Sequence, residues 1–257
     1  MKKIVIFILS VFMTMSLIAC NNNTSSENID SKDNKEIFHY EIGNIILEDG
    51  SIVRAQDLNQ IDNSCLPIAI IVDLRDDGTL LGMGVHRSET SLQWAKDNSI
   101  GYKTRFEDII AESHDENADE ANFTGDIDGS DNWNYICLSD KQNTEIDPNN
   151  YPAFQFVNTY AKNYQICDNY ASHWYMPSIA ELCTIYKNRE TINFSLQKIY
   201  ELDKNAAMNG LGTNWYWSSS QSKSNDEYVW FVHYYNGYIS DCPKNFTNLH
   251  VLAVRVF

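Results

Sequence analysis

The chain has 257 residues, of which 43% are hydrophobic and 12% aromatic, enough apolar surface for a packed core. There are 35 acidic residues against 19 basic ones, and the formal net charge at pH 7 is -16. Nucleic-acid binding draws much of its affinity from clusters of Lys and Arg that neutralise phosphates. Because no such cluster is present, the composition excludes a nucleic acid as a partner.

The first 20 residues, MKKIVIFILSVFMTMSLIAC, are typical of a bacterial lipoprotein signal. Two lysines precede an apolar run that is too short for a spanning helix, and the closing LIAC resembles a lipobox. We therefore expect a signal peptide over residues 1–19 and an acylated Cys20 that anchors the protein to a membrane without spanning it. Asn21, in place of an aspartate, favours an outer-membrane or cell-surface location. The alternative is an ordinary secretory signal in which Cys20 is incidental.

A polar stretch, residues 20–36, follows the signal and contains one large apolar residue, Ile29. It buries too little surface to offset the entropy of ordering, which predicts a flexible, lipid-anchored tether.

Five cysteines lie beyond this tether, an odd number that leaves at least one thiol unpaired. Their spacing shows no CxxC and no Cys/His pattern of a zinc site, so we expect most of them to be small buried residues.

Residues 37–122 are predicted to be a β-rich N-terminal segment. Apolar runs meet at an Asp-Gly pair at 49–50 and again at 77–78, and Asp-Gly between apolar runs is a strong hairpin signal. The rest of the segment is polar, acidic and irregular. These patterns predict a small β-meander ahead of a second folded part, residues 123–257.

The stretch TGDIDGSDNW places Asp126, Asp128 and Asp131 around Gly129. Alternating carboxylates about a glycine can cup a hard cation through oxygen ligands, so a calcium (Ca2+) site at these aspartates is one prediction. An EF-hand loop would need a further oxygen ligand and a closing glutamate at set offsets, and neither fits. An Asx-rich turn without metal is therefore the favoured interpretation, and no other cofactor is expected.

Two segments show the apolar spacing of helices. Pro152 precedes apolar residues at helical spacing, which predicts an amphipathic helix over residues 151–164. Ser178 followed three residues later by Glu181 forms a capping-box pattern, which predicts a helix beginning at Ile179. The sequence TINFSLQKIYELD then carries a third helix or extends the second after a kink.

From Trp215 the apolar period changes to two. YVWFVHYY is followed by an Asn-Gly pair at 236–237 and by YIS, the signature of a hairpin, and VLAVRVF supplies a last strand. Helices flanked by antiparallel strands, with the C-terminal strand returning to a sheet, predict an α+β fold. The stretch WYWSSS is expected to be mainly structural.

Four pieces of the second part, HWYMPSIAELCTIYKN, YWSSSQ, YVWFVHYYNGYI and LAVRVF, occur in an order that resembles the C-terminal domain of Lcl-type collagen-like adhesins of bacteria. The resemblance covers about residues 151–257 and, more loosely, the meander from residue 42. It implies a C-type-lectin-like domain related to the formylglycine-generating-enzyme branch of that fold, with antiparallel sheets and two or three helices. Members of the resembling family have largely undetermined functions.

Alternation along residues 228–235 assigns Phe231, His233 and Tyr235 to the face opposite the family's core positions. We predict that these rings form an exposed aromatic stripe suited to recognition. In the alternative interpretation, the meander or the 241–250 loop covers them. The predicted ligand surface comprises Phe231, His233, Tyr235, Ser240, Asp241, Phe246, Asn248 and His250.

Each of these eight residue types can arise from an asparagine codon when its adenines are changed. Some lectin-fold relatives of the resembling family are variable proteins of diversity-generating retroelements, which are rewritten in that way. A diversified variable protein is therefore one hypothesis for this C-terminal region.

Formylglycine-generating enzymes of the resembling fold use a pair of cysteines near the C-terminus that bind copper. Here the final stretch contains Cys242 alone, and Cys183 lies far off on a predicted helix. No Ser/His/Asp order, phosphate-binding glycine loop or HExxH motif is present, so we expect no enzyme. Two hypotheses remain: a non-catalytic, adhesin-like module that binds an extracellular glycan or protein, and an envelope structural lipoprotein without free ligand.

Overall fold

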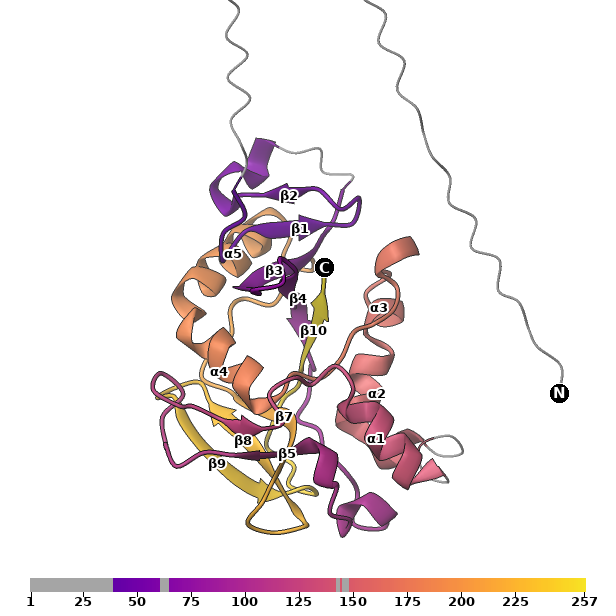
Figure 1. The fold of residues 1–257 in the computed structure, drawn as a ribbon. Coiled ribbons are helices and arrows are strands. Elements are labelled where there is room, and N and C mark those ends of the chain that lie inside the picture. Colours follow the sequence, from indigo (N-terminus) through magenta and orange to yellow (C-terminus); the bar gives the residue numbers. More distant parts are fainter. Residues whose placement is uncertain (1–38, 61–64, 142–143, 145–147) are drawn as a thin grey trace, which may run out of the picture. The chain divides into compact units, whose positions relative to one another are not determined.

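Two five-stranded sheets organise residues 39–257 (Figure 1). The computed structural model describes residues 39–60, 65–141, 144 and 148–257. The predicted signal peptide, Cys20 and the tether lie outside the described residues. Within the described ranges, no helix is long and apolar enough to cross a membrane.

The first sheet joins the N-terminal hairpins to the last strand of the chain. Its strands are β1 (Ile45–Leu47), β2 (Ile52–Val53), β3 (Pro67–Leu74), β4 (Leu80–Arg87) and β10 (Leu252–Val256). They lie in the order β10-β4-β3-β1-β2, with all neighbours antiparallel. Both predicted Asp-Gly hairpins are confirmed. Gly50 and Gly78 make their turns with φ of 85° and 86°, a conformation that glycine adopts without a Cβ penalty.

The second sheet is built mainly from the C-terminal strands. Its strands are β5 (Ile110–Glu112), β6 (Thr124–Gly125), β7 (Trp215–Ser222), β8 (Tyr228–His233) and β9 (Tyr238–Pro243). The order is β6-β5-β7-β8-β9, and β5 runs parallel to β7 while the other neighbours are antiparallel. The predicted Asn-Gly hairpin is confirmed between β8 and β9.

The two sheets do not separate at the predicted boundary between residues 122 and 123. Strand β10 comes from the second predicted part and pairs with β4 of the first. Strand β5 comes from the first part and pairs with β7 of the second. Residues 39–257 therefore form one folded unit instead of a meander followed by a domain. The prediction was wrong because local patterns do not show which distant strands pair.

Among the residues that the structure describes, five α-helices complete the α+β fold, which confirms the predicted class. They are α1 (Asn132–Ser139), α2 (Pro152–Asn158), α3 (Tyr160–Asn163), α4 (Ile179–Lys187) and α5 (Arg189–Leu202). The predicted helix over 151–164 is confirmed as α2 and α3, which are separated at Thr159. Figure 1 shows α4 and α5 on one side of the sheets and α1 to α3 on the other. Short 3-10 helices span Ala55–Gln60, Ile100–Tyr102, Glu107–Ile109, Pro148–Asn150 and Asp168–Tyr170.

The capping box of α4 is confirmed. The Oγ atom of Ser178 accepts a hydrogen bond from the Glu181 backbone N–H at 3.2 Å, and Oε2 of Glu181 accepts one from the Ser178 N–H at 2.9 Å. Glu181 also accepts from Arg75 at 2.7 Å, from the Tyr175 hydroxyl at 2.8 Å and from the Gly129 N–H at 3.1 Å. This buried carboxyl therefore joins the start of α4 to three other parts of the chain.

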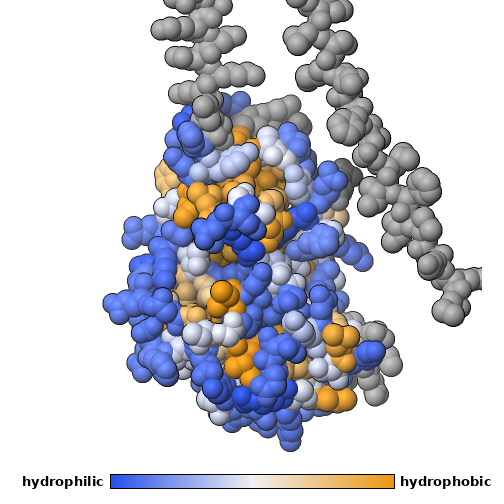
Figure 2. Space-filling view, viewed as in Figure 1, coloured by the Kyte–Doolittle hydropathy of each residue, from blue (hydrophilic) through white to orange (hydrophobic). Residues whose placement is uncertain are grey.

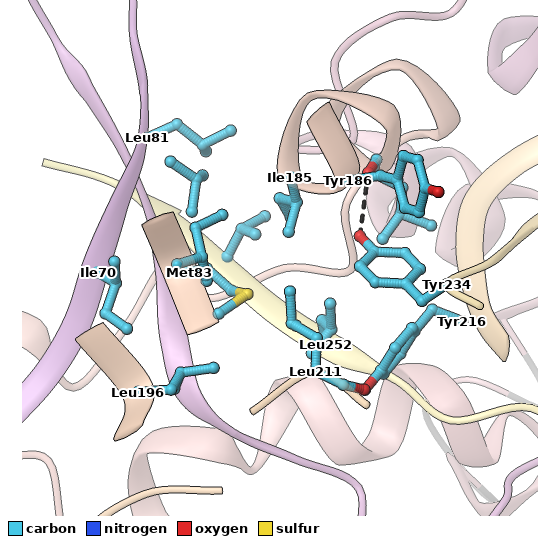
Figure 3. Close-up of a cluster of buried hydrophobic side chains, with 14 of the residues drawn as sticks. Ile70, Leu81, Met83, Ile185, Tyr186, Leu196, Leu211, Tyr216, Tyr234 and Leu252 are labelled. Carbon is cyan, nitrogen blue, oxygen red and sulfur yellow. Dashed lines mark hydrogen bonds between the residues drawn. The ribbon is translucent and has the colours of Figure 1, made fainter. Parts of the chain in front are cut away.

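The first core lies against α4 and α5 (Figure 3). Tyr216 and Tyr234 reach into it from the second sheet. The Tyr234 hydroxyl donates to the Leu182 carbonyl at 3.0 Å, and the Tyr216 hydroxyl donates to the Leu211 carbonyl at 2.7 Å. Both hydroxyls are thus satisfied while their rings are buried. Aliphatic side chains fill the remaining space, among them Ile70, Met83, Ile185, Leu196 and Leu252.

A second core covers the opposite face of the second sheet. It contains Trp217, Phe231 and Val229 from β7 and β8, packed with aromatic residues such as Trp94 and Phe154. Trp94 meets Phe154 edge-on, with ring centroids 4.8 Å apart. The second sheet is therefore buried on both faces along most of its length.

Lys244 is a fully buried lysine that directly follows β9. Its Nζ donates to the backbone carbonyls of Gly101 and Thr104 at 2.8 Å each and to that of Asp226 at 2.7 Å. The ammonium also lies 5.2 Å from the centroid of Trp94 and 5.0 Å from that of Phe106. Lys244 thereby fixes two loops against the second core.

Candidate functional site

Phe231 is part of the core, which corrects its predicted place on an exposed stripe. It is 4% exposed and stacks on Trp215, with centroids 5.1 Å apart and ring planes 4° from parallel. Alternation along β8 was read correctly. The prediction failed because the second core covers the face that was expected to meet solvent.

His233 and Tyr235 lie at the open end of the same strand. The half-buried His233 ring meets Trp215 edge-on at 4.9 Å and lies 6.0 Å from Tyr235, which is 73% exposed. Tyr238, directly opposite His233 across the hairpin, is 42% exposed. We call Trp215, His233, Tyr235 and Tyr238 the turn aromatics. Of these four, His233 and Tyr235 belong to the predicted stripe, and Trp215 and Tyr238 lie beside them.

The predicted residues of the C-terminal loop differ in exposure, and the His250 N–H donates to the Trp215 carbonyl at 2.8 Å. Phe246 and Asn248 are exposed, whereas His250 is half-buried and its Nδ1 lies 2.9 Å from the Ser88 carbonyl. His250 is thus held by the protein itself and is not a free ligand group. The hypothesis of a diversified surface requires the eight predicted residues to form one exposed surface. They do not, because Phe231 is buried and His250 is held by Ser88.

Ser240 and Asp241 line a cavity that the sequence did not predict. After β5 the chain crosses the second sheet, because β5 pairs with β7 while the Glu116 carbonyl accepts from the Ile239 N–H of β9 at 3.0 Å. A cavity of about 420 Å³ lies between this crossing segment and the sheet, and we call it the β9 pocket. Its lining includes Glu112, His114, Asp115 and Glu116 from the segment and Ser222, Ser224, Trp230, Ser240 and Asp241 from the sheet.

The sheet side of the β9 pocket combines an aromatic ring with a fixed carboxylate. Trp230 and Asp241 lie opposite each other on β8 and β9, so their side chains share one face. The half-buried Trp230 donates from Nε1 to the Ala111 carbonyl at 2.9 Å. Asp241 accepts hydrogen bonds from the hydroxyls of Ser222, at 2.5 Å, and Ser224. These groups can hold a polar ligand against an apolar surface, which is the composition of many small-ligand sites.

Sequence reasoning missed the crossing segment and Trp230. The segment lies in a polar run that was read as irregular, and only the apolar residues Ile109, Ile110 and Ala111 signalled a short strand within it. Trp230 was assigned to the core. It packs against the first core and meets Phe123 edge-on at 5.9 Å, and it also lines the pocket.

The predicted calcium site at Asp126, Asp128 and Asp131 is not formed. Asp126 turns inward and accepts from Asn132 at 2.6 Å, while Asp128 accepts from the Ser130 N–H at 3.0 Å in an Asx turn. Among the described residues, no group of three or more His, Cys, Asp or Glu side chains could hold a metal ion. The side chains of Asp126 and Asp128 accept backbone N–H hydrogen bonds within the local turn.

Cys183 and Cys242 are not brought together. Cys183 belongs to the first core and Cys242 packs against the second, on the opposite face of the second sheet. Burial raises the pKa of each thiol to about 12, so both are neutral at physiological pH. Neither Cys183 nor Cys242 takes part in a disulfide. The arrangement offers no cysteine pair for copper.

On the face seen in Figure 2, hydrophobic residues form separate groups among hydrophilic ones. The exposed large aliphatic side chains come from distant elements, among them Leu66, Ile100, Ile127, Leu138 and Leu202.

Comparison with known families places the chain in the Lcl C-terminal domain family, whose model matches residues 84–255. The predicted family is therefore confirmed. Among solved structures the chain is similar to a fimbrial protein from Bacteroides ovatus ATCC 8483, whose crystal structure was determined at 1.85 Å resolution.

The two chains share 16% identity and superpose with a TM-score of 0.56 over 85% of this chain and 49% of that one. The chain thus spans about half the length of the fimbrial protein, and at this identity the likeness concerns the fold alone. No curated protein matches the sequence.

Proposed function

We propose that this protein is a cell-envelope lipoprotein whose folded part is a non-catalytic, adhesin-like module that binds an extracellular glycan or protein. The observation that carries the proposal is the β9 pocket, where Trp230 and the fixed carboxylate of Asp241 face a cavity of about 420 Å³. Membership of the Lcl C-terminal domain family and the fold likeness to a fimbrial protein support a role at the cell surface.

The N-terminal sequence supports the mode of display. In the proposal, Cys20 is acylated, and the polar stretch 20–36 holds the folded part away from an outer membrane or cell surface. The relation to C-type-lectin-like folds of the formylglycine-generating-enzyme branch also belongs to the proposal, and it rests on the sequence resemblance.

Binding can be tested with the full chain, purified in detergent, on an array of glycans and extracellular proteins. We expect at least one ligand that binds the natural chain and loses most of its signal with the double variant His114→Ala/Asp241→Asn. Both positions line the pocket and neither belongs to a core. The matched control is Lys204→Ala, at an exposed position outside the pocket. Ligands that bind both variants equally well would place recognition elsewhere.

One observation favours the structural alternative, an envelope lipoprotein without free ligand. Phe231, the centre of the predicted recognition stripe, is buried against Trp215. The exposed aromatic surface at the end of the second sheet is therefore smaller than the sequence predicts. An array on which the natural chain binds no ligand would support this alternative.

A further inference from the structure

We infer that a second cavity, between residues 88–96 and the helices α2 and α3, binds a neutral oligosaccharide. We call it the α2–α3 cleft; its volume is about 760 Å³, within the range of roughly 300 to 1,000 Å³ usual for ligand sites. None of the residues lining the β9 pocket contributes to it. The inference therefore goes beyond the proposed function and stands independently of that pocket.

Backbone contacts hold the two walls of the cleft in place. The Ala153 N–H at the start of α2 donates to the Gln93 carbonyl at 3.0 Å, and the Lys96 N–H donates to the Asn150 carbonyl at 2.9 Å. On the other side, the Leu92 N–H donates to the Leu249 carbonyl at 2.8 Å. Because these walls are tied to both the helix and the C-terminal loop, the cleft is preformed.

Aromatic rings and uncharged polar groups alternate on the helical wall. Phe156 and Tyr164 both line the cleft and are half-buried. His86 stacks on Tyr164 at 4.0 Å, so Phe156 is the ring we assign to stacking on the C–H face of a sugar. Gln155, Thr159 and Asn163 lie along the same wall. An amide both donates and accepts hydrogen bonds, which matches the vicinal hydroxyls of a sugar ring.

The charge of the cleft favours a neutral ligand. Glu89 and Lys96 contribute one charge of each sign. His86 stacks on Tyr164 with centroids 4.0 Å apart, and burial lowers its pKa to about 4, so its ring is uncharged at physiological pH. With a chain charge of -16 as background, a polyanion is disfavoured.

An extended peptide fits less well than a sugar. A peptide that adds a strand needs free backbone groups along an edge. In the wall at 88–96 the N–H groups of Ser88, Leu92, Trp94 and Ala95 are already bonded to the C-terminal loop, at Val251, Leu249 and Lys244. The wall therefore offers fewer free backbone groups than a strand-adding peptide needs.

Saturation-transfer difference NMR tests the inference with the full chain and three probes: maltotriose, cellotriose and N,N′,N″-triacetylchitotriose. We expect saturable binding of at least one probe. Phe156→Leu and Asn163→Ala should each weaken that binding about tenfold, as expected for losing one stacking or hydrogen-bond contact. Asn163 is exposed, so Asn163→Ala should fold normally. It therefore tests the inference even if Phe156→Leu does not fold.

The matched control is Asn158→Ala, an exposed position on α2 outside the cleft, which should bind like the natural chain. Absence of saturable binding for all three probes overturns the inference. So does binding that is unchanged in Asn163→Ala, or binding lost in His114→Ala/Asp241→Asn, which would assign the sugar to the β9 pocket. Array binding that depends on the β9 pocket, together with no sugar in the cleft, leaves the proposed function standing.

Discussion

The environment of Lys244 makes its protonation a determinant of stability. Burial lowers the pKa of its ammonium from 10.5 to about 7, against the opposing effect of Asp226 and Glu227. Between pH 7 and 10.5 the unfolded chain therefore binds a proton that the folded chain does not. The free energy of unfolding should rise with pH across that window, by at most about 1.4 kcal/mol per pH unit from this group.

Lys244→Met removes the titrating group and its hydrogen bonds to the three carbonyls, which keep second donors: the Thr104 N–H for Gly101 and the Gln221 side chain for Thr104 and Asp226. The variant should be less stable at alkaline pH, because each lost hydrogen bond contributes about 0.5 to 1.5 kcal/mol. Its deficit relative to the natural chain should grow from neutral to alkaline pH. Denaturant unfolding of both chains at several pH values measures this difference. A deficit that is constant with pH would show that Lys244 keeps its ordinary pKa.

Phe231 and Tyr235 differ in burial although both follow the same alternation. Phe231→Ala should destabilise the fold by about 3 to 5 kcal/mol, since it empties a place in the second core. Tyr235→Ala, at a 73% exposed position, should change stability by no more than about 0.5 kcal/mol. Thermal unfolding of the two single variants checks this. Similar melting temperatures for both would mean that the second core does not cover β8.

At this scale the sequence predicts which side chains share a face and not what covers that face. Phe231, His233 and Tyr235 do point the same way, as alternation requires. Phe231 is core because it stacks on Trp215 and shares a cluster with residues more than 100 positions away, such as Trp94 and Phe106. The β9 pocket was missed for the same reason, since its two walls are distant in sequence.

Among the elements, α4 has the clearest dependence on single side chains. Removing the Ser178 hydroxyl should cost on the order of 1 kcal/mol, the usual value of an N-cap. Leu182→Ala should cost about 2 to 5 kcal/mol, because Leu182 is fully buried in the first core. Urea unfolding of both variants measures the two costs. Equal and small effects would show that the α4 face does not anchor the core.

Elements set by local chemistry could be predicted, and those set by distant pairing could not. The capping box and the Asp-Gly and Asn-Gly turns need only neighbouring residues, and all of them are confirmed. The parallel pairing of β5 with β7 joins Ile110 to Gln221, and no local pattern specifies it. That pairing forms one wall of the β9 pocket, so the candidate site depends on the least predictable part of the fold.

For the whole molecule, the proposed anchor gives a direct prediction. Cys20→Ala removes the acylated side chain, so the variant should move from the membrane fraction to the soluble fraction when cells are broken. Fractionation followed by immunoblotting measures this, and a substitution at Asn21 serves as the control. A Cys20→Ala protein that still sediments with membranes would contradict the lipid anchor.

The central claim, a binding module displayed at the cell surface, is tested most directly by treating intact cells with trypsin. The folded part carries exposed trypsin sites, such as Lys103 and Lys223. If the protein is displayed for ligand binding, the full-length band should disappear from intact cells while a cytoplasmic marker survives. A full-length band that persists until the envelope is permeabilised would contradict surface display and favour the structural lipoprotein.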